Sequence, residues 1–160
     1  MLDSLDQKLI QQLQNDGRRS NVELAKMLGV AESTIRNRTK KLVNSGTIKI
    51  VAVPDPFKLG YGCVSIVGLQ VKLSELNQVA EKLAQSPQVF LLASITGHFD
   101  LIMILVLRTP QELSNFMSSE VFTIPSILRS ETFVCMEITK SPWTETTEST
   151  KLLANSETVD

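Results

Sequence analysis

The run Leu101–Leu107 constrains the fold of this chain most strongly. Its seven residues, LIMILVL, are all apolar, so the run lacks the alternation of polar and apolar residues that marks a strand with one face in water. We therefore predict a strand that is buried on both faces. Burial of one such side chain contributes about 1.5 to 3 kcal/mol, so exposure of three or four of them would forfeit a large stabilisation.

The sequence around this run predicts one antiparallel sheet. Four segments are strand-like: 62–73, 89–96, 101–107 and 131–138. Ser74 would cap a helix between the first and second of these segments, and Thr109 would cap a helix between the third and fourth. This βαββαβ order places both helices on one face of the sheet, which is the ferredoxin-like plan. The other face of the central strand then needs a cover, either a second copy of the chain or the chain's own linker.

The first fifty residues predict three short helices. Capping boxes at Ser4–Gln7 and Ser20–Glu23 would open the first two, and the third would span residues 32–45. Gly29 stands in the short turn before the third helix, a spacing typical of helix-turn-helix proteins, whose second member enters the major groove of DNA. The β-branched run 47–53 predicts a wing or hinge strand.

The outer side of the third helix is polar and basic, which suits contact with DNA. The candidate DNA-binding residues are Ser33, Thr34, Arg36, Asn37, Arg38, Lys40 and Lys41. Residues 1–50 hold nine Lys and Arg against five Asp and Glu, whereas the remaining residues hold seven against twelve, so a polyanion should meet the front of the chain. A solvated basic helix face is the alternative, and Arg38 could instead bind an acidic residue of its own domain.

Two motifs stand out in one short chain: Leu5 to Ile48, especially residues 15–18, 23–25, 33–38 and 42–46, and Thr96-Gly97-His98-Phe99-Asp100. Together they resemble the Lrp/AsnC (feast/famine) family of bacterial and archaeal transcription regulators. The first is similar to the family's winged helix-turn-helix domain, and the second is similar to the turn motif of its amino-acid-binding domain. The resemblance covers about residues 2–142. Ala31 departs from it, because the family usually has a Ser there that caps the reading helix.

The resemblance implies a regulator that binds double-stranded DNA and responds to a small amino acid effector. It also implies a homodimer that can assemble further into a tetramer or octamer. The candidate effector-binding residues are Thr96, Gly97, His98, Asp100 and Thr132. Backbone N–H groups at a Gly turn can donate to a carboxylate, and Asp100 can meet an ammonium group. From the residues alone, Gly97 could merely supply a positive φ, Asp100 could cap the turn, and His98 could be inert.

The predicted fold class is therefore α+β, with an N-terminal winged helix-turn-helix and a C-terminal ferredoxin-like βαββαβ domain. We expect four parts: a DNA-binding domain at 1–53, a hinge at 54–61, a ligand-sensing and oligomerisation domain at 62–140, and an acidic, disordered tail at 141–160.

Several other classes of function are disfavoured. Cys63 and Cys135 form no CxxC motif and His98 is the only histidine, so we expect no metal and no cofactor. No apolar run approaches the roughly 20 residues that cross a bilayer, so we expect a cytoplasmic protein without a membrane partner. A siroheme-decarboxylase-like enzyme of haem biosynthesis, whose two-domain plan is similar, and a ligand-blind architectural DNA-binding protein are the alternatives. The second domain offers an enzyme only one histidine and two arginines, Arg108 and Arg129, so we expect no enzyme.

Overall fold

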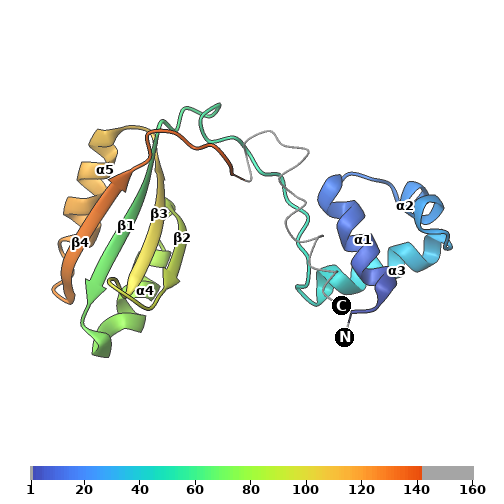
Figure 1. The fold of residues 1–160 in the computed structure, drawn as a ribbon, viewed down its shortest axis with the longest axis horizontal. Helices are drawn as coiled ribbons and strands as arrows, with labels where there is room; N and C mark the ends of the chain where they lie inside the picture. Colours follow the sequence, from blue (N-terminus) through green and yellow to red (C-terminus); the bar gives the residue numbers. More distant parts are fainter. Residues whose placement is uncertain (1, 142–160) are drawn as a thin grey trace, which may run out of the picture. The chain divides into compact units, whose positions relative to one another are not determined.

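The computed structural model describes residues 2–141 (Figure 1). The chain divides between Val53 and Pro54 into two compact units. The first contains three helices, and the second contains a four-stranded sheet with helices. All but the first residue of the predicted acidic tail lies outside the described residues.

The first unit is a bundle of α1 (Ser4–Asn15), α2 (Asn21–Leu28) and α3 (Glu32–Asn44). Its core consists of one apolar cluster from all three helices: Leu9, Leu24, Ala25, Ile35 and Leu42. The predicted capping box Ser20–Glu23 opens α2, and Gly29, with φ 67°, ends it. Ala31 gives α3 no side-chain cap. The predicted helix-turn-helix is thus confirmed.

Two local predictions in this unit are wrong. Asp3, not Ser4, caps α1, because its carboxylate accepts a hydrogen bond from the N–H of Asp6 while the Asp6 side chain accepts from the N–H of Asp3. The run 47–53 forms no strand. β-branched residues favour a strand only where a partner strand can pair with them, and within the described residues this run has none.

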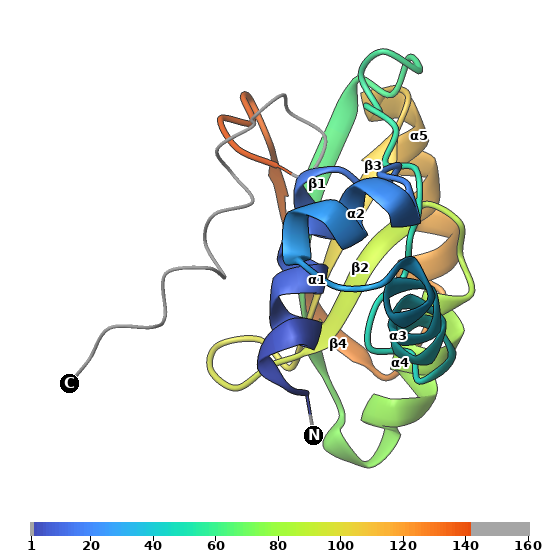
Figure 2. The ribbon, with the colours of Figure 1, turned by 90° about the vertical axis from the view of Figure 1, so that its right-hand side faces the viewer.

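The second unit has one antiparallel sheet with the strand order β2-β3-β1-β4. The strands are β1 (Cys63–Val71), β2 (Val89–Ser94), β3 (Leu101–Leu107) and β4 (Ile127–Val134). The helices are α4 (Leu76–Ala84) and α5 (Pro110–Phe116), and a π-helical turn (Met117–Val121) continues α5. Figures 1 and 2 show α4 and α5 on the same face of the sheet. The predicted α+β class with a βαββαβ order is confirmed.

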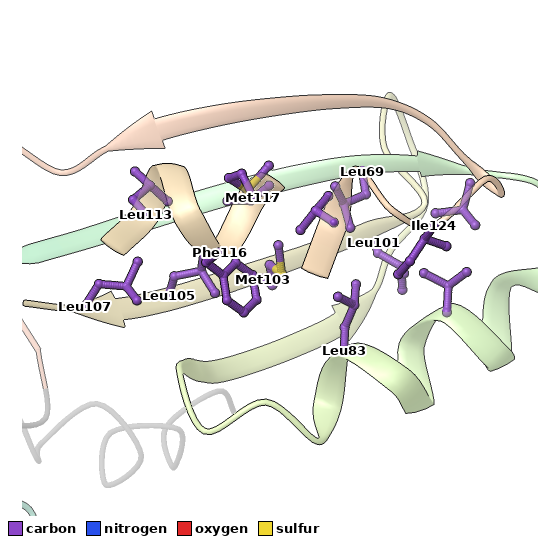
Figure 3. Close-up of a cluster of buried hydrophobic side chains, with 14 of the residues drawn as sticks. Leu69, Leu83, Leu101, Met103, Leu105, Leu107, Leu113, Phe116, Met117 and Ile124 are labelled. Atoms are coloured by element: carbon purple, nitrogen blue, oxygen red, sulfur yellow. The ribbon is translucent and has the colours of Figure 1, made fainter. Parts of the chain in front are cut away.

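Strand β3 has two different faces, although its sequence is apolar throughout. Its fully buried side chains, from Leu101 to Leu107 at every second position, meet the helices, as Figure 3 shows for Met103 beside Phe116. The residues between them, Ile102, Ile104 and Val106, are only half-buried. We call the helix-free side of the sheet the open face.

Some boundaries in this unit differ from the prediction. β4 begins at Ile127 and ends at Val134, four residues earlier than predicted, because its extent is set by pairing with β1, in which Thr132 lies opposite Val67. Ser74 does not cap α4, because a 3-10 turn (Leu73–Glu75) contains it and precedes the helix.

The segment 54–61 forms an internally hydrogen-bonded turn whose Tyr61 ring contacts Arg108. The carboxylate of Asp55 accepts a hydrogen bond from the N–H of Phe57, and the N–H of Tyr61 donates to Pro56. The guanidinium of Arg108 lies 4.8 Å from the centre of the Tyr61 ring. The segment therefore belongs to the same compact unit as the sheet, which spans Pro54–Thr139.

Candidate nucleic-acid interface and effector site

Helix α3 presents most of the predicted DNA-binding residues to solvent. Burial of Ile35 and Leu42 fixes which side of the helix faces the core. The exposed residues of the opposite side are Ser33, Arg36, Asn37, Lys40 and Lys41, whereas Thr34 and Arg38 are half-buried. This side therefore offers hydroxyl, amide, ammonium and guanidinium groups together, the set that contacts bases and phosphates.

Arg36 is already engaged within its own helix. Its guanidinium forms an exposed ion pair with Glu32, one turn earlier. Such i,i+4 pairs contribute little in water, so a guanine or a phosphate can displace Glu32 at small cost.

Arg38 turns away from this set. Its Nη1 donates to Asp6 Oδ1 at 2.9 Å and also to the carboxylate of Asp3. The Arg38 hydrogen bond is the main cause that holds the pKa of Asp3 below its usual range. This contact is the intramolecular salt bridge that the sequence left open as an alternative.

The structure also gathers cations at the turn between α1 and α2. A hollow there is lined by Asp16, Arg18, Arg19, Glu23, Lys26 and Met27. The pKa of Glu23 is lowered, first by the backbone hydrogen bond from Ser20 and then by the Ser20 hydroxyl. Sequence reasoning did not select Arg18, Arg19 or Lys26, and the surplus of basic residues in the first fifty positions is the signal that could have indicated them.

The predicted effector turn joins β2 to β3. Thr96, Gly97 and His98 are exposed, and Gly97 adopts φ 131°, a value that favours glycine. Asp100 fastens the turn to β1, because its N–H donates to the carbonyl of Leu69 at 2.9 Å and its Oδ2 accepts from the N–H of Val71 at 2.8 Å. One oxygen of Asp100 therefore already has a structural partner.

Phe99 lies on the open face of the sheet, over Gly68 of β1. Its ring meets the ring of His98 edge to face, with the centroids 4.8 Å apart. Gln70 adds a further tie, because its side-chain amide donates to the carbonyl of His98 at 2.8 Å. The turn is thus held against β1 by both aromatic packing and hydrogen bonds.

Glu131 of β4 reaches this turn, and Arg129 of the same strand pairs with Glu131. Glu131 Oε1 lies 3.7 Å from His98 Nε2 and 2.7 Å from the guanidinium of Arg129. Sequence reasoning missed both as effector-site residues, since nothing local indicates the register in which β4 pairs with β1. Thr132, which it did select, lies opposite Val67 and therefore on the other face from Glu131, because successive strand residues point to opposite faces. The structure thus brings Glu131, with Arg129 paired to it, rather than Thr132 to the turn.

The make-up of residues 2–141 also bears on metal binding and on membrane spanning. No group of three or more His, Cys, Asp and Glu side chains there could hold a metal ion. In the same part of the chain, no helix combines the length and apolar character needed to span a bilayer.

Both units match models of known domains. Residues 2–43 match the AsnC-type helix-turn-helix domain, and residues 64–143 match the Lrp/AsnC ligand binding domain. An uncharacterized HTH-type transcriptional regulator of Pyrococcus furiosus is 39% identical over 141 residues, which are 88% of this chain and 95% of that relative.

Solved structures show the same arrangement of elements. AsnC of E. coli has a TM-score of 0.81 at 25% identity, with 88% of this chain and 96% of that chain covered. A transcriptional regulator of Neisseria meningitidis, solved as a complex with L-Met, has a TM-score of 0.80 at 21% identity, with 88% and 94% covered. The second likeness is one of fold.

Proposed function

This chain belongs to the Lrp/AsnC family of transcriptional regulators, and we propose that it reads DNA through α3 and senses a small amino acid at the turn around Gly97. It is a transcriptional regulator with a DNA-binding helix-turn-helix and a ligand-binding domain. The exposed polar and basic side of α3 supports the first part of the proposal, and the tethered turn between β2 and β3 supports the second.

In the proposed DNA complex, α3 lies in the major groove of double-stranded DNA. Arg36 leaves Glu32 and holds a guanine through two hydrogen bonds, while Lys40 and Lys41 neutralise phosphates. Ser33, Thr34 and Asn37 supply shorter-range hydrogen bonds to bases or phosphates. The missing side-chain cap at Ala31 leaves free N–H groups at the start of α3, which can also donate to a phosphate.

The proposed effector is a zwitterion, which needs a partner for each of its charges. The exposed N–H groups of the Thr96–Gly97–His98 turn, together with the guanidinium of Arg129, can bind its carboxylate. Asp100, through its second oxygen, and Glu131 can bind its ammonium group. The L-Met complex of the Neisseria meningitidis regulator, which shares the fold, supports an amino acid as the class of ligand.

The open face of the sheet supports the proposed homodimer. Six apolar side chains lie on it at least partly exposed: Ile66, Leu91, Ile102, Ile104, Val106 and Phe133. A second copy of the same face would cover them, since a patch of this kind is costly to leave in water. Further assembly into a tetramer or octamer would bring effector turns of different dimers together.

The effector would act on DNA through assembly. The proposed effector turn and α3 belong to different units of the chain. A ligand at Gly97 would therefore change DNA occupancy by altering how the α3 helices of the two protomers in a dimer are placed. These helices must match major grooves about 34 Å apart, or a multiple of that distance. We place this activity in the cytoplasm, where bacterial and archaeal DNA lies, and infer that the chain is no enzyme because its relatives are named transcriptional regulators.

A thermal-shift screen of the full chain against the twenty amino acids tests the effector part. A ligand that binds only the folded state raises its stability, by about 2.7 kcal/mol at a concentration of 100 times its Kd. One or a few amino acids should stabilise the protein, and they should change its DNA occupancy. Stabilisation by none would favour the architectural alternative, and stabilisation by a tetrapyrrole would favour the enzyme.

A further inference from the structure

We propose that Arg38 is a positioning residue, which fixes the reading helix α3 against the start of α1 through Asp3 and Asp6 and does not itself contact DNA. The inference rests on the proposed DNA contact by α3. It moves Arg38 from the predicted DNA contacts to a structural role. It also gives Asp3 and Asp6, whose negative charges would by themselves repel DNA, a role in DNA recognition.

The contact joins two elements that are distant in sequence. Arg38 lies in the middle of α3, whereas Asp3 is the N-cap of α1 and Asp6 is the third residue of the same cap. One nitrogen, Nη1, donates to both carboxylates. Because the cap already holds the two carboxylates together through backbone hydrogen bonds of 2.9 and 3.3 Å, Arg38 meets a rigid pair of acceptors.

The burial of Asp6 means that its carboxylate needs a charged partner. Asp6 is 4% exposed and lies among the buried residues of the first unit. A buried carboxylate is tolerated when it is paired, and here its ion-pair partner in the described part of the chain is Arg38. Asp3 adds a second negative charge beside it, whose pKa is lowered mainly by the Arg38 hydrogen bond. Departure of Arg38 toward a phosphate would leave both charges without this partner.

This pair can fix an orientation that the core alone cannot. Ile35 and Leu42 hold α3 by apolar packing, which is favourable over a range of rotations because the hydrophobic effect is not directional. Charge-assisted hydrogen bonds from a planar guanidinium are directional. Arg36 differs, because its partner Glu32 is in the same helix and cannot restrain α3 against α1.

The direction in which Asp6→Asn changes DNA affinity distinguishes a positioning role from simple electrostatic repulsion. Asp6→Asn removes a negative charge from the DNA-binding unit, so electrostatics alone would strengthen DNA binding. Asn retains an oxygen that can accept the N–H of Asp3, so the cap survives. If Asp6 positions α3 through Arg38, the same substitution should instead weaken recognition of the specific site. Asp16→Asn is the matched control, since Asp16 lies in the same unit and has no ion pair with Arg38.

The experiment uses the full chain and a DNA site that the wild-type protein selects from a random-sequence pool. Affinities for this site and for unrelated DNA are measured over a range of salt concentrations for Asp6→Asn, Asp3→Asn, Arg38→Lys and Asp16→Asn. We expect the first three to lower the ratio of specific to nonspecific affinity by about tenfold, as residues of one ion-pair network can. Affinity for unrelated DNA should hold or rise in the two Asp variants, and Asp16→Asn should keep the wild-type ratio.

Three results would overturn the inference. The first is an undiminished ratio in Asp3→Asn and Asp6→Asn. The second is a log-log salt slope that an added charge-removing variant, Arg38→Gln, reduces by about one, which would make Arg38 a phosphate contact. The third is an equal loss of specific and nonspecific affinity in variants that remain folded by circular dichroism, which would mean that these residues do not act on specificity. If Asp6→Asn does not fold, the ratio of specific to nonspecific affinity in Asp3→Asn and Arg38→Lys provides the test. Failure of the proposed function itself is distinct, because Lys41→Ala would then also leave DNA affinity unchanged.

Discussion

The ring of Phe99 lies so close to Gly68 that a Cβ atom at position 68 would be 2.5 Å from the ring. Glycine at this point of β1 is therefore required by a close approach and not by its backbone angles. The same contact holds the turn between β2 and β3 on the sheet, since Phe99 stands between His98 and Asp100 in that turn.

Gly68→Ala should consequently destabilise the second unit by about 1 to 3 kcal/mol, the usual cost of overpacking. Denaturant unfolding at a fixed protein concentration measures this. Combining it with Phe99→Leu, which shortens the obstructing side chain, should recover part of the loss. Strictly additive effects of the two substitutions would contradict the direct contact.

Substitutions in β3 test the open face as a dimer interface. Met103 is fully buried against the helices, so Met103→Asp should unfold the unit, because an unpaired buried charge costs several kcal/mol. Ile104 lies on the open face, so Ile104→Asp should give a folded protein of lower mass. Analytical ultracentrifugation and circular dichroism distinguish the two. A wild-type protein that sediments as a folded monomer would contradict the proposed dimer interface.

Two variants of α3 should weaken DNA binding in different ways. Arg36→Ala should cost about 1 to 3 kcal/mol and relax base specificity, as loss of a bidentate base contact does. Lys41→Ala should weaken binding to all sequences and reduce the log-log salt slope by about one. Fluorescence anisotropy over a salt series measures both. Unchanged affinity in both variants would exclude α3 as the reading helix.

The helical unit was largely predictable from its sequence, because its signals are local. Ser20–Glu23 and Gly29 act as the spacing predicts. The cap of α1 is the exception, since Asp3–Asp6 and Ser4–Gln7 are competing boxes shifted by one residue. The structure uses the box that also binds Arg38, 35 positions away, and no local pattern contains that contact.

The sheet was predictable in its order but not in its register. The four strands and their antiparallel arrangement followed from apolar strand-like runs and turns, whereas the bounds of β4 depend on β1. For the same reason, the charged residues beside the effector turn could not be found. Glu131 meets His98 only because β4 pairs with β1, and one residue further along, Thr132 points to the other face.

Asp100→Asn should separate effector sensing from folding. Asn keeps an oxygen that can accept the N–H of Val71, so the turn should persist, but it loses the charge that would bind an ammonium group. We expect the variant to fold, dimerise and bind DNA without responding to the effector. Calorimetric titration, with mass measured at each effector concentration, checks this. Equal effector affinity in both proteins would remove Asp100 from the site.

Acid should weaken the first unit through Asp3. Because its pKa is lower in the folded protein than in the unfolded chain, its stabilising contribution is present above the ordinary aspartate pKa of about 4 and is lost as the pH falls through the folded value. Urea unfolding of the full chain, followed by the methyl NMR signals of Leu9 and Leu24, should show this loss. Arg38→Gln should flatten the dependence, and an identical pH profile in both proteins would contradict the assignment.

The central position of β1 bears on the order in which the protein can form during its synthesis. β1 pairs with β4 through Ser65 and Val134, which lie near opposite ends of the unit in the sequence, whereas α1, α2 and α3 all lie within residues 4–44. Distant pairings close slowly and local ones quickly. The three-helix unit can therefore fold while the ribosome is still translating the second unit. The sheet stays incomplete until β4 emerges. A nascent chain would thus complete its helix-turn-helix domain before its ligand-binding domain.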